Sequence, residues 1–203
     1  AVDYFIEELG VEVFALLGTD YVYPRTTNRI VEQYLLDAGI PQENIFVNYT
    51  PFGQSDWSSI VADVVALGEG GQQVGVISTI NGDANVGFYN ELAASNISAD
   101  DIPVVAFSVG EEELSGLDTS NLVGHLAAWN YFQSADTPEN EAFIAAWHEF
   151  TGDDTRVTND PMEAHYIGFN MGVQAVEAAG TTDVDAVREA MYGIQVPNLT
   201  GGI

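Results

Sequence analysis

Short, almost wholly apolar runs alternate with longer amphipathic stretches along the first two-thirds of the sequence. The runs are too short for buried helices and are rich in valine, isoleucine and phenylalanine. This pattern is typical of strands in a parallel sheet that is covered on both faces. The predicted strands are 13–17, 45–47, 74–78, 104–107 and 122–129.

The stretches between these runs repeat their apolar residues every three or four positions, as amphipathic helices do. Pro24 and Gly39 flank the first stretch at places typical of a helix start and a helix stop. The predicted helices are 25–38, one capped by Ser55, 84–94 and a short one over 111–117. This alternation predicts an α/β domain with a parallel sheet and right-handed crossovers.

From about residue 136 onward the pattern contains helices only. Residues 136–138 are predicted to cap and open one helix, and residues 160–180 form a longer one closed by its final glycine. Thr182 with Asp185 three positions later is similar to a capping box and predicts a third helix. The glycine-rich tail 197–203 is predicted to have no regular structure of its own.

The charge balance limits the function classes. The 203 residues include 31 acidic and 4 basic side chains, so the formal net charge is −27, and no basic residue is a lysine. A Walker A lysine and a Schiff-base or pyridoxal phosphate lysine are therefore excluded. A field this negative repels nucleic-acid backbones and anionic membrane surfaces, which argues against nucleic acid as a partner.

The same composition is typical of proteins that work in concentrated salt. At about 1 M salt the Debye length falls to roughly 3 Å, so that surface carboxylates repel one another less. We therefore expect a saline habitat, with an ordinary acidic protein as the alternative. The aromatic content of 11% argues against disorder.

Few features bear on cellular location. The sequence has no cysteine, which excludes disulfides and thiolate-bound metals and suits a protein outside the cytoplasm. It has no apolar run of 18 residues, so no membrane span is expected. It opens at Ala1 inside a helical pattern without Met or a signal peptide, and we expect a mature or truncated piece. N-glycosylation triplets begin at Asn48, Asn96 and Asn198.

No catalytic or metal-binding template is complete. Residues 53–56 begin like a hydrolase nucleophile elbow, but Trp57 replaces the closing glycine. Residues 148–149 begin like a zinc-protease helix, but Gly152 occupies the next ligand position. Residues 81–92 match only the first half of a calcium loop. We therefore expect no enzyme activity, no catalytic residue, no metal and no cofactor.

Polar and aromatic side chains gather instead directly after the predicted strands. Ligands of open α/β sheets bind outside the carboxyl ends of the strands. Carboxylate and amide oxygens there can accept hydrogen bonds from a ligand's NH₂ groups, and a tyrosine ring can stack on a small polar ligand. The candidate ligand-binding residues are Asp20, Tyr21, Asn81, Gly82, Asp83 and Glu111.

Structural alternatives remain open for two of these segments. Residues 81–83 could form only a turn with a helix N-cap. Glu111 could simply interact favourably with the dipole of the helix that it begins. The sequence does not decide between these roles and ligand binding.

Several stretches, in order along the chain, resemble substrate-binding proteins of urea-type ABC transporters. Residues 18–25, GTDYVYPR, resemble the GSDYVFPR stretch of that family, and residues 78–85, STINGDAN, are similar to its NTINGDSN stretch. Residues 107–114, FSVGEEEL, are similar to its FSIAEEEL stretch. Further matches are in residues 127–134, 136–140 and 160–164. The amide-sensing regulator of amidase operons shares the first motif more loosely.

The resemblance implies a type I periplasmic-binding-protein fold, in which two α/β lobes close on urea or a short amide. It assigns residues 1–134 to the second α/β lobe and residues 135–203 to helices that normally pack on the first lobe. The segment that normally forms the first lobe is expected to be absent. The candidate residues then form one wall of the ligand pocket.

The function implied by the resemblance is non-catalytic. The chain is expected to belong to an extracytoplasmic solute-binding component, lipid-anchored in the full-length protein, that delivers urea or a short-chain amide to a membrane permease. An amide-sensing regulatory domain that reports ligand occupancy to a signalling partner is the alternative. The absence of a nucleophile–base pair disfavours an amide hydrolase.

Overall fold

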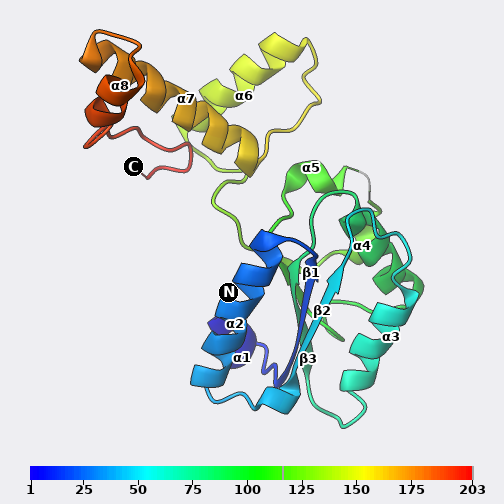
Figure 1. Cartoon of the computed structure of the whole chain (residues 1–203). Helices are drawn as coiled ribbons and strands as arrows, with labels where there is room; N and C mark the ends of the chain where they lie inside the picture. Colours follow the sequence, from blue (N-terminus) through cyan, green and yellow to red (C-terminus); the bar gives the residue numbers. More distant parts are fainter. Residues whose placement is uncertain (116, 203) are drawn as a thin grey trace. The chain divides into compact units, whose positions relative to one another are not determined.

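The computed structural model describes residues 1–115 and 117–202, which form two compact units. The first unit contains Ala1–Val109 and Glu113–Trp129. The second contains Gly110–Glu112 and the chain from Asn130 onward. Figure 1 labels the helices of both units and the first three strands of the chain.

The first unit is built on a parallel sheet, as the sequence predicts. The strands are β1 (Val13–Thr19), β2 (Ile45–Thr50), β3 (Val74–Thr79), β4 (Val104–Ala106) and β5 (Leu126–Ala127). Their order is β2-β1-β3-β4-β5, and every neighbouring pair is parallel. All residues of β1 and β3 are buried, which explains why these two strands are apolar on both faces.

Helices cover both faces of this sheet (Figure 1). They are α1 (Val2–Glu7), α2 (Val22–Asp37), α3 (Ser58–Leu67) and α4 (Ala84–Ala94), with short 3₁₀ helices at Gln42–Asn44 and Thr119–Asn121. Alternate residues of β1 point to opposite faces. Leu17 joins the core under α3 and α4, whereas Phe14 and Leu16 join the core under α1 and α2.

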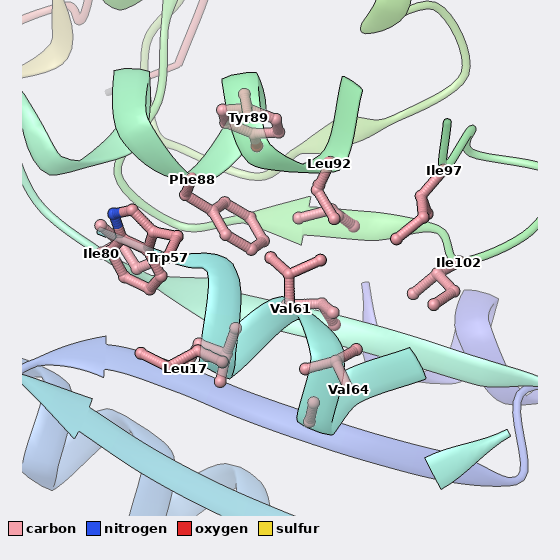
Figure 2. Packing of buried hydrophobic residues seen from close by; sticks show 14 of the residues in the cluster. Leu17, Trp57, Val61, Val64, Ile80, Phe88, Tyr89, Leu92, Ile97 and Ile102 are labelled. Carbon is pink, nitrogen blue, oxygen red and sulfur yellow. The ribbon is translucent and has the colours of Figure 1, made fainter. Parts of the chain in front are cut away.

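The core beneath α3 and α4 is the larger one (Figure 2). Trp57, directly before α3, packs edge-on against Phe88 of α4 with ring centroids 5.3 Å apart. Val61 and Leu92 fill the space between the two helices and the sheet (Figure 2). This packing fixes the position of the α4 N-terminus, which lies next to the carboxyl end of β3.

Three sequence predictions for residues 55–129 need correction. The strand predicted over 122–129 is limited to Leu126–Ala127, because Asp118 caps a 3₁₀ helix before it and Gly124 turns the chain with φ +97°. The helix predicted over 111–117 is α5 (Glu111–Leu114), and residue 116 lies outside the described residues. The N-cap predicted at Ser55 is wrong, since α3 begins at Ser58, whose N–H donates to Asp56.

The second unit contains the predicted helices α6 (Pro138–Thr151), α7 (Asp160–Ala179) and α8 (Val184–Ala190). The side chain of Thr137 caps α6, and Gly152 and Gly180 end α6 and α7 in the left-handed conformation. The predicted capping box at Thr182 is wrong, because Asp183 supplies the cap by accepting the Ala186 N–H.

A buried polar cluster holds the second unit together. The Tyr131 hydroxyl donates to Asn140 Oδ1 and lies 2.7 Å from Thr158 Oγ1. Asp160 Oδ2 accepts the N–H groups of residues 130 and 131. Residues 197–202 contain no helix or strand, as predicted for the tail, and residue 203 lies outside the described residues. Leu199 is nevertheless buried, and its N–H donates to Glu163.

None of the helices in the described residues is long and apolar enough to cross a membrane.

Candidate functional site

The candidate site lies where the chain reverses its direction across the sheet. From β1 the chain passes through α2 to β2 on one side, and it then returns to β3 on the other side of β1. In sheets of this strand order, ligands bind at the carboxyl ends of the strands on either side of the reversal. Those strands are β1 and β3, which Asp20 and Asn81 follow.

The structure brings five of the six predicted residues to this edge of the sheet. Asp20 and Tyr21 follow β1, and residues 81–83 follow β3. The two segments are joined by a hydrogen bond from the Asn81 N–H to Thr19 Oγ1, at 3.0 Å. We call these five residues the β1/β3 wall.

Tyr21 belongs to a cluster of three aromatic rings. Its ring centroid lies 5.1 Å from that of Phe52 and 6.1 Å from that of Tyr23. Burial, together with the nearby Tyr23, raises the pKa of the Tyr21 hydroxyl, which stays protonated as a donor. The Tyr23 hydroxyl donates to the Phe107 carbonyl at 3.1 Å, so the cluster is tied to the end of β4.

Phe52 was missed by the sequence analysis. It lies two residues after β2, and it is 65% exposed although its ring contacts that of Tyr21. The available signal was its position just after a predicted strand.

Asp20 is engaged within the protein. Its Oδ1 accepts a hydrogen bond from Arg25 Nε at 2.6 Å, and the Arg25 guanidinium lies 4.7 Å from the Tyr49 ring centroid. The hydrogen bond from Arg25 is the main reason that the pKa of Asp20 lies below its ordinary value. Asp20 is thus a charged residue that also positions Arg25.

Asn81 is tied to the ends of β1 and β3 by two hydrogen bonds that it donates. Its Nδ2 donates to the Thr79 carbonyl at 3.0 Å, and its backbone N–H is used by Thr19. The following turn depends on Gly82, which has φ +63°. The Gly82 carbonyl accepts from the backbone N–H and the side chain of Asn85.

Asp83 occupies the N-cap position of α4, but its side chain makes no capping hydrogen bond. The turn predicted as the structural alternative is therefore present without the side-chain cap. The exposed carboxylate lines a pocket of about 400 Å³ together with Gln54, Ser55 and Asn90. A carboxylate in this position is an acceptor for donor groups of a ligand.

Glu111 belongs to the second unit. Its Oε1 accepts the Ser134 N–H at 3.0 Å, and its Oε2 is buried with no hydrogen-bond partner among the described residues. An unpaired buried carboxylate oxygen is costly unless a donor reaches it. A role for Glu111 in ligand binding remains a prediction.

The histidines of the chain serve the fold. His125 Nδ1 accepts the Val104 N–H at 3.1 Å, and burial lowers the pKa of this ring. The rings of His148 and His165 lie within hydrogen-bond distance of backbone carbonyls. Within residues 1–115 and 117–202, no group of three or more acidic or histidine side chains could hold a metal ion.

Comparison with known proteins gives a family match over the whole chain. A family model described as "Periplasmic binding protein domain" matches residues 1–203. Among curated proteins, limonene hydroxylase from Geobacillus stearothermophilus is 32% identical over 80 residues, which cover 39% of this chain and 14% of that protein.

Solved structures share the fold at low sequence identity. An amino acid ABC transporter substrate-binding protein from Pseudomonas fluorescens Pf-5 matches with a TM-score of 0.82 and 19% identity, over 99% of this chain and 52% of that one. A solute-binding protein from Rhodopseudomonas palustris BisB5, in complex with 3,4-dihydroxybenzoic acid, matches with a TM-score of 0.80 and 17% identity. The match covers 97% of this chain and 52% of that one. A leucine-binding protein from Thermotoga maritima MSB8 matches with a TM-score of 0.74 and 13% identity, over 98% of this chain and 54% of that one. The chain thus spans about half the length of these structures.

Proposed function

The chain belongs to the periplasmic binding protein domain family, and on that premise we propose that it is part of a solute-binding component of an ABC transporter. In this proposal the protein captures a solute outside the cytoplasm and delivers it to a membrane permease. It does so without chemical change, and the functional event is the closure of two lobes on the solute.

The observation that carries the proposal is the convergence of the β1/β3 wall at the reversal point of the sheet. Hydrogen-bonding groups and aromatic rings from segments far apart in sequence meet there. Such a mixture of a few placed polar groups and an apolar surface is typical of small-molecule sites.

The charges of the wall favour a neutral solute with N–H donors. Asp83 presents an exposed carboxylate and Asn81 an amide oxygen, whereas the cationic side chain of Arg25 is paired with Asp20. The net charge of −27 adds to the repulsion of anions. We therefore propose urea or a short-chain amide as the solute, with Tyr21 as the stacking ring.

A further part of the proposal concerns the helices of the second unit. Large apolar side chains on α6, α7 and the segment after α8 are exposed, among them Phe150 at 83%, Phe169 at 72% and Tyr192 at 80%. The structures that share the fold are about twice as long as this chain. We propose that an additional α/β lobe, supplied by further chain of the same protein, covers these side chains.

The test is titration calorimetry of the full protein with urea and acetamide. Tyr21→Ala and Asp83→Ala should each weaken binding roughly ten- to hundredfold. Each variant leaves a hydrogen-bonding group of the solute unpaired once the lobes close over it, which costs about 1–3 kcal/mol. Glu43→Gln is the matched control. Glu43 is an exposed residue in the 3₁₀ helix that precedes β2, at the opposite edge of the sheet, and its substitution should leave binding unchanged.

Leucine and 3,4-dihydroxybenzoate, chosen from the names of the similar structures, complete the set of compounds titrated. Binding of either in place of the amides would overturn the proposed solute but not the role in solute binding. Wild-type affinity for an amide in both wall variants, with the fold intact, would show that other residues recognise it.

A further inference from the structure

The α2 helix turns one polar residue toward the sheet. The buried positions of α2 are Pro24, Asn28, Val31 and Leu35, and three of the four are apolar, as expected for a helix face against a sheet. Asn28 is the exception, with 1% of its surface exposed. Its side chain meets β3 at Thr79, the last residue of that strand.

Asn28 and Thr79 form a buried junction at the carboxyl ends of β1 and β3. Thr79 Oγ1 lies 3.1 Å from Asn28 Oδ1 and 3.1 Å from the Leu17 carbonyl oxygen, so its single proton serves these two acceptors. Thr79 has no exposed surface. The junction therefore connects α2, β1 and β3 at one point.

Gly18 provides the space that this junction needs. A Cβ at position 18 would lie 2.5 Å from Thr79 Oγ1 and 2.7 Å from Pro24 Cβ, closer than atoms can approach. The residues that follow the junction in sequence are those of the β1/β3 wall, Asp20 and Tyr21 after β1 and Asn81 after β3. The junction is thus the base from which both segments of the wall leave the sheet.

Stability alone does not explain an asparagine at this position. Asn28 Nδ2 is buried and has no hydrogen-bond partner among the described residues. A buried amide that leaves its donor group unpaired is less favourable than an apolar side chain of the same size. What distinguishes Asn28 from other buried polar groups is its hydrogen bond with Thr79 beside Gly18, which ties α2 to the end of β3.

We propose that Asn28 and Thr79 are positioning residues for solute binding: their hydrogen bond over Gly18 fixes the separation and orientation of the two segments of the β1/β3 wall. This inference rests on the proposed function for its binding readout. It adds a role for two residues that do not themselves face the solute.

The test compares Thr79→Val with Thr79→Ser. Valine removes the hydroxyl and keeps the shape, whereas serine keeps the hydroxyl. Thr79→Val should weaken the affinity for urea or acetamide about tenfold, and Thr79→Ser should restore it to within about twofold of wild type. The matched control is the same change at Thr50, a buried threonine at the carboxyl end of β2 whose hydroxyl has no hydrogen-bond partner in the described part of the chain. Thr50→Val should bind like wild type.

Asn28→Leu separates positioning from stability. It removes the unpaired amide, so the melting temperature should stay the same or rise while the affinity for the amide falls at least fivefold. If the melting temperature and the affinity fall together, Asn28 has a structural role only, and the proposal is overturned. Unchanged affinity in both Asn28→Leu and Thr79→Val would also overturn it.

Hydrogen exchange gives a readout that does not depend on the solute. The Asn81 N–H, bonded to Thr19 Oγ1, should exchange at least tenfold faster in Thr79→Val, while the Val76 N–H within β3 should not change. If the wild-type protein binds no amide, the proposed solute fails, and the exchange at Asn81 still decides the positioning role. Unchanged exchange at Asn81 would overturn it.

Discussion

Gly18 is the residue at which the fold and the candidate site are most tightly linked. Its backbone φ is not positive, so glycine is required there for space and not for backbone conformation. The atoms that a methyl group would meet are the Thr79 hydroxyl and the Pro24 ring, neither of which lies at the end of a flexible side chain.

We expect Gly18→Ala to destabilise the first unit by about 1–3 kcal/mol, the usual cost of overpacking a core. The measurement is chemical denaturation. Gly172→Ala is the control, because a Cβ at this position in α7 would meet no atom within 4 Å, and glycine lowers helix stability. That variant should be stabilised by about 0.5–1 kcal/mol. A Gly18→Ala variant as stable as wild type would contradict the close approach.

Glu163 is the acidic residue whose environment most clearly opposes its charge. Its side chain is buried, and this burial raises its pKa above the ordinary value of 4.5, with the nearby Asp160 adding to the shift. The hydrogen bond from the Leu199 N–H acts in the opposite direction. The protonated form of Glu163 is therefore favoured by folding.

The pH dependence follows from this direction. A raised folded-state pKa contributes stability that is complete below about pH 4.5 and is lost as the pH rises through the folded-state value. Glu163→Gln keeps an oxygen for the Leu199 N–H and removes the charge. Thermal melts at pH 7 should therefore show a higher melting temperature for the variant, on the order of a few degrees. The difference should vanish near pH 4. Glu149→Gln, which removes an exposed charge, should raise the melting temperature at pH 7 by less than Glu163→Gln does.

At the scale of elements, the sequence predicted the helices and strands whose signals are local, such as an apolar run or a capping residue. Strands β1 and β3 are buried on both faces, so their apolar runs are unambiguous. Helices α6 and α7 have caps at Thr137 and Asn159 and glycine at their ends, which are local signals. The two-residue β5 has no pattern of its own, because only its pairing with β4 makes it a strand.

The location of the candidate site could be predicted from the sequence, but the side-chain contacts within it could not. Loops after parallel strands must meet at one edge of a sheet, so the grouping of Tyr21 with Asn81 followed from topology. The ion pair of Asp20 with Arg25 and the contact of Phe52 with Tyr21 depend on side-chain geometry. The Asn28–Thr79 junction joins residues 51 positions apart and leaves no signal in sequence periodicity.

The helices of the second unit give a test at the same scale. Their exposed apolar side chains exceed what the small core of Tyr131, Phe143 and Leu199 can cover. We expect backbone amides of α6–α8 in the chain alone to exchange at least tenfold faster than those of β3, because local stability follows buried apolar contact. If the amides of α6–α8 are protected from exchange as strongly as those of β3 in a verified monomer, the proposal of a covering lobe is contradicted.

At the scale of the whole molecule, charge is the dominant feature. With 31 acidic and 4 basic residues, one-to-one pairing can neutralise at most four carboxylates. Two ion pairs are formed in the described part of the chain, Asp20 with Arg25 and Asp185 with Arg188. The remaining carboxylates repel one another over distances set by the salt concentration.

Stability should therefore depend strongly on salt. Folding gathers the carboxylates into a smaller volume, so their mutual repulsion opposes the folded state, and screening weakens this repulsion as the Debye length falls from about 10 Å at 0.1 M to about 3 Å at 1 M. Between 0.1 M and 2 M KCl we expect the melting temperature to rise on the order of 10 °C. A series in NaCl at matched ionic strength keeps the anion and the screening the same and changes only the cation. Equal rises indicate screening, whereas a larger rise in KCl indicates potassium held by carboxylates. A flat or falling melting temperature in both series would show that the acidic surface is not an adaptation to salt.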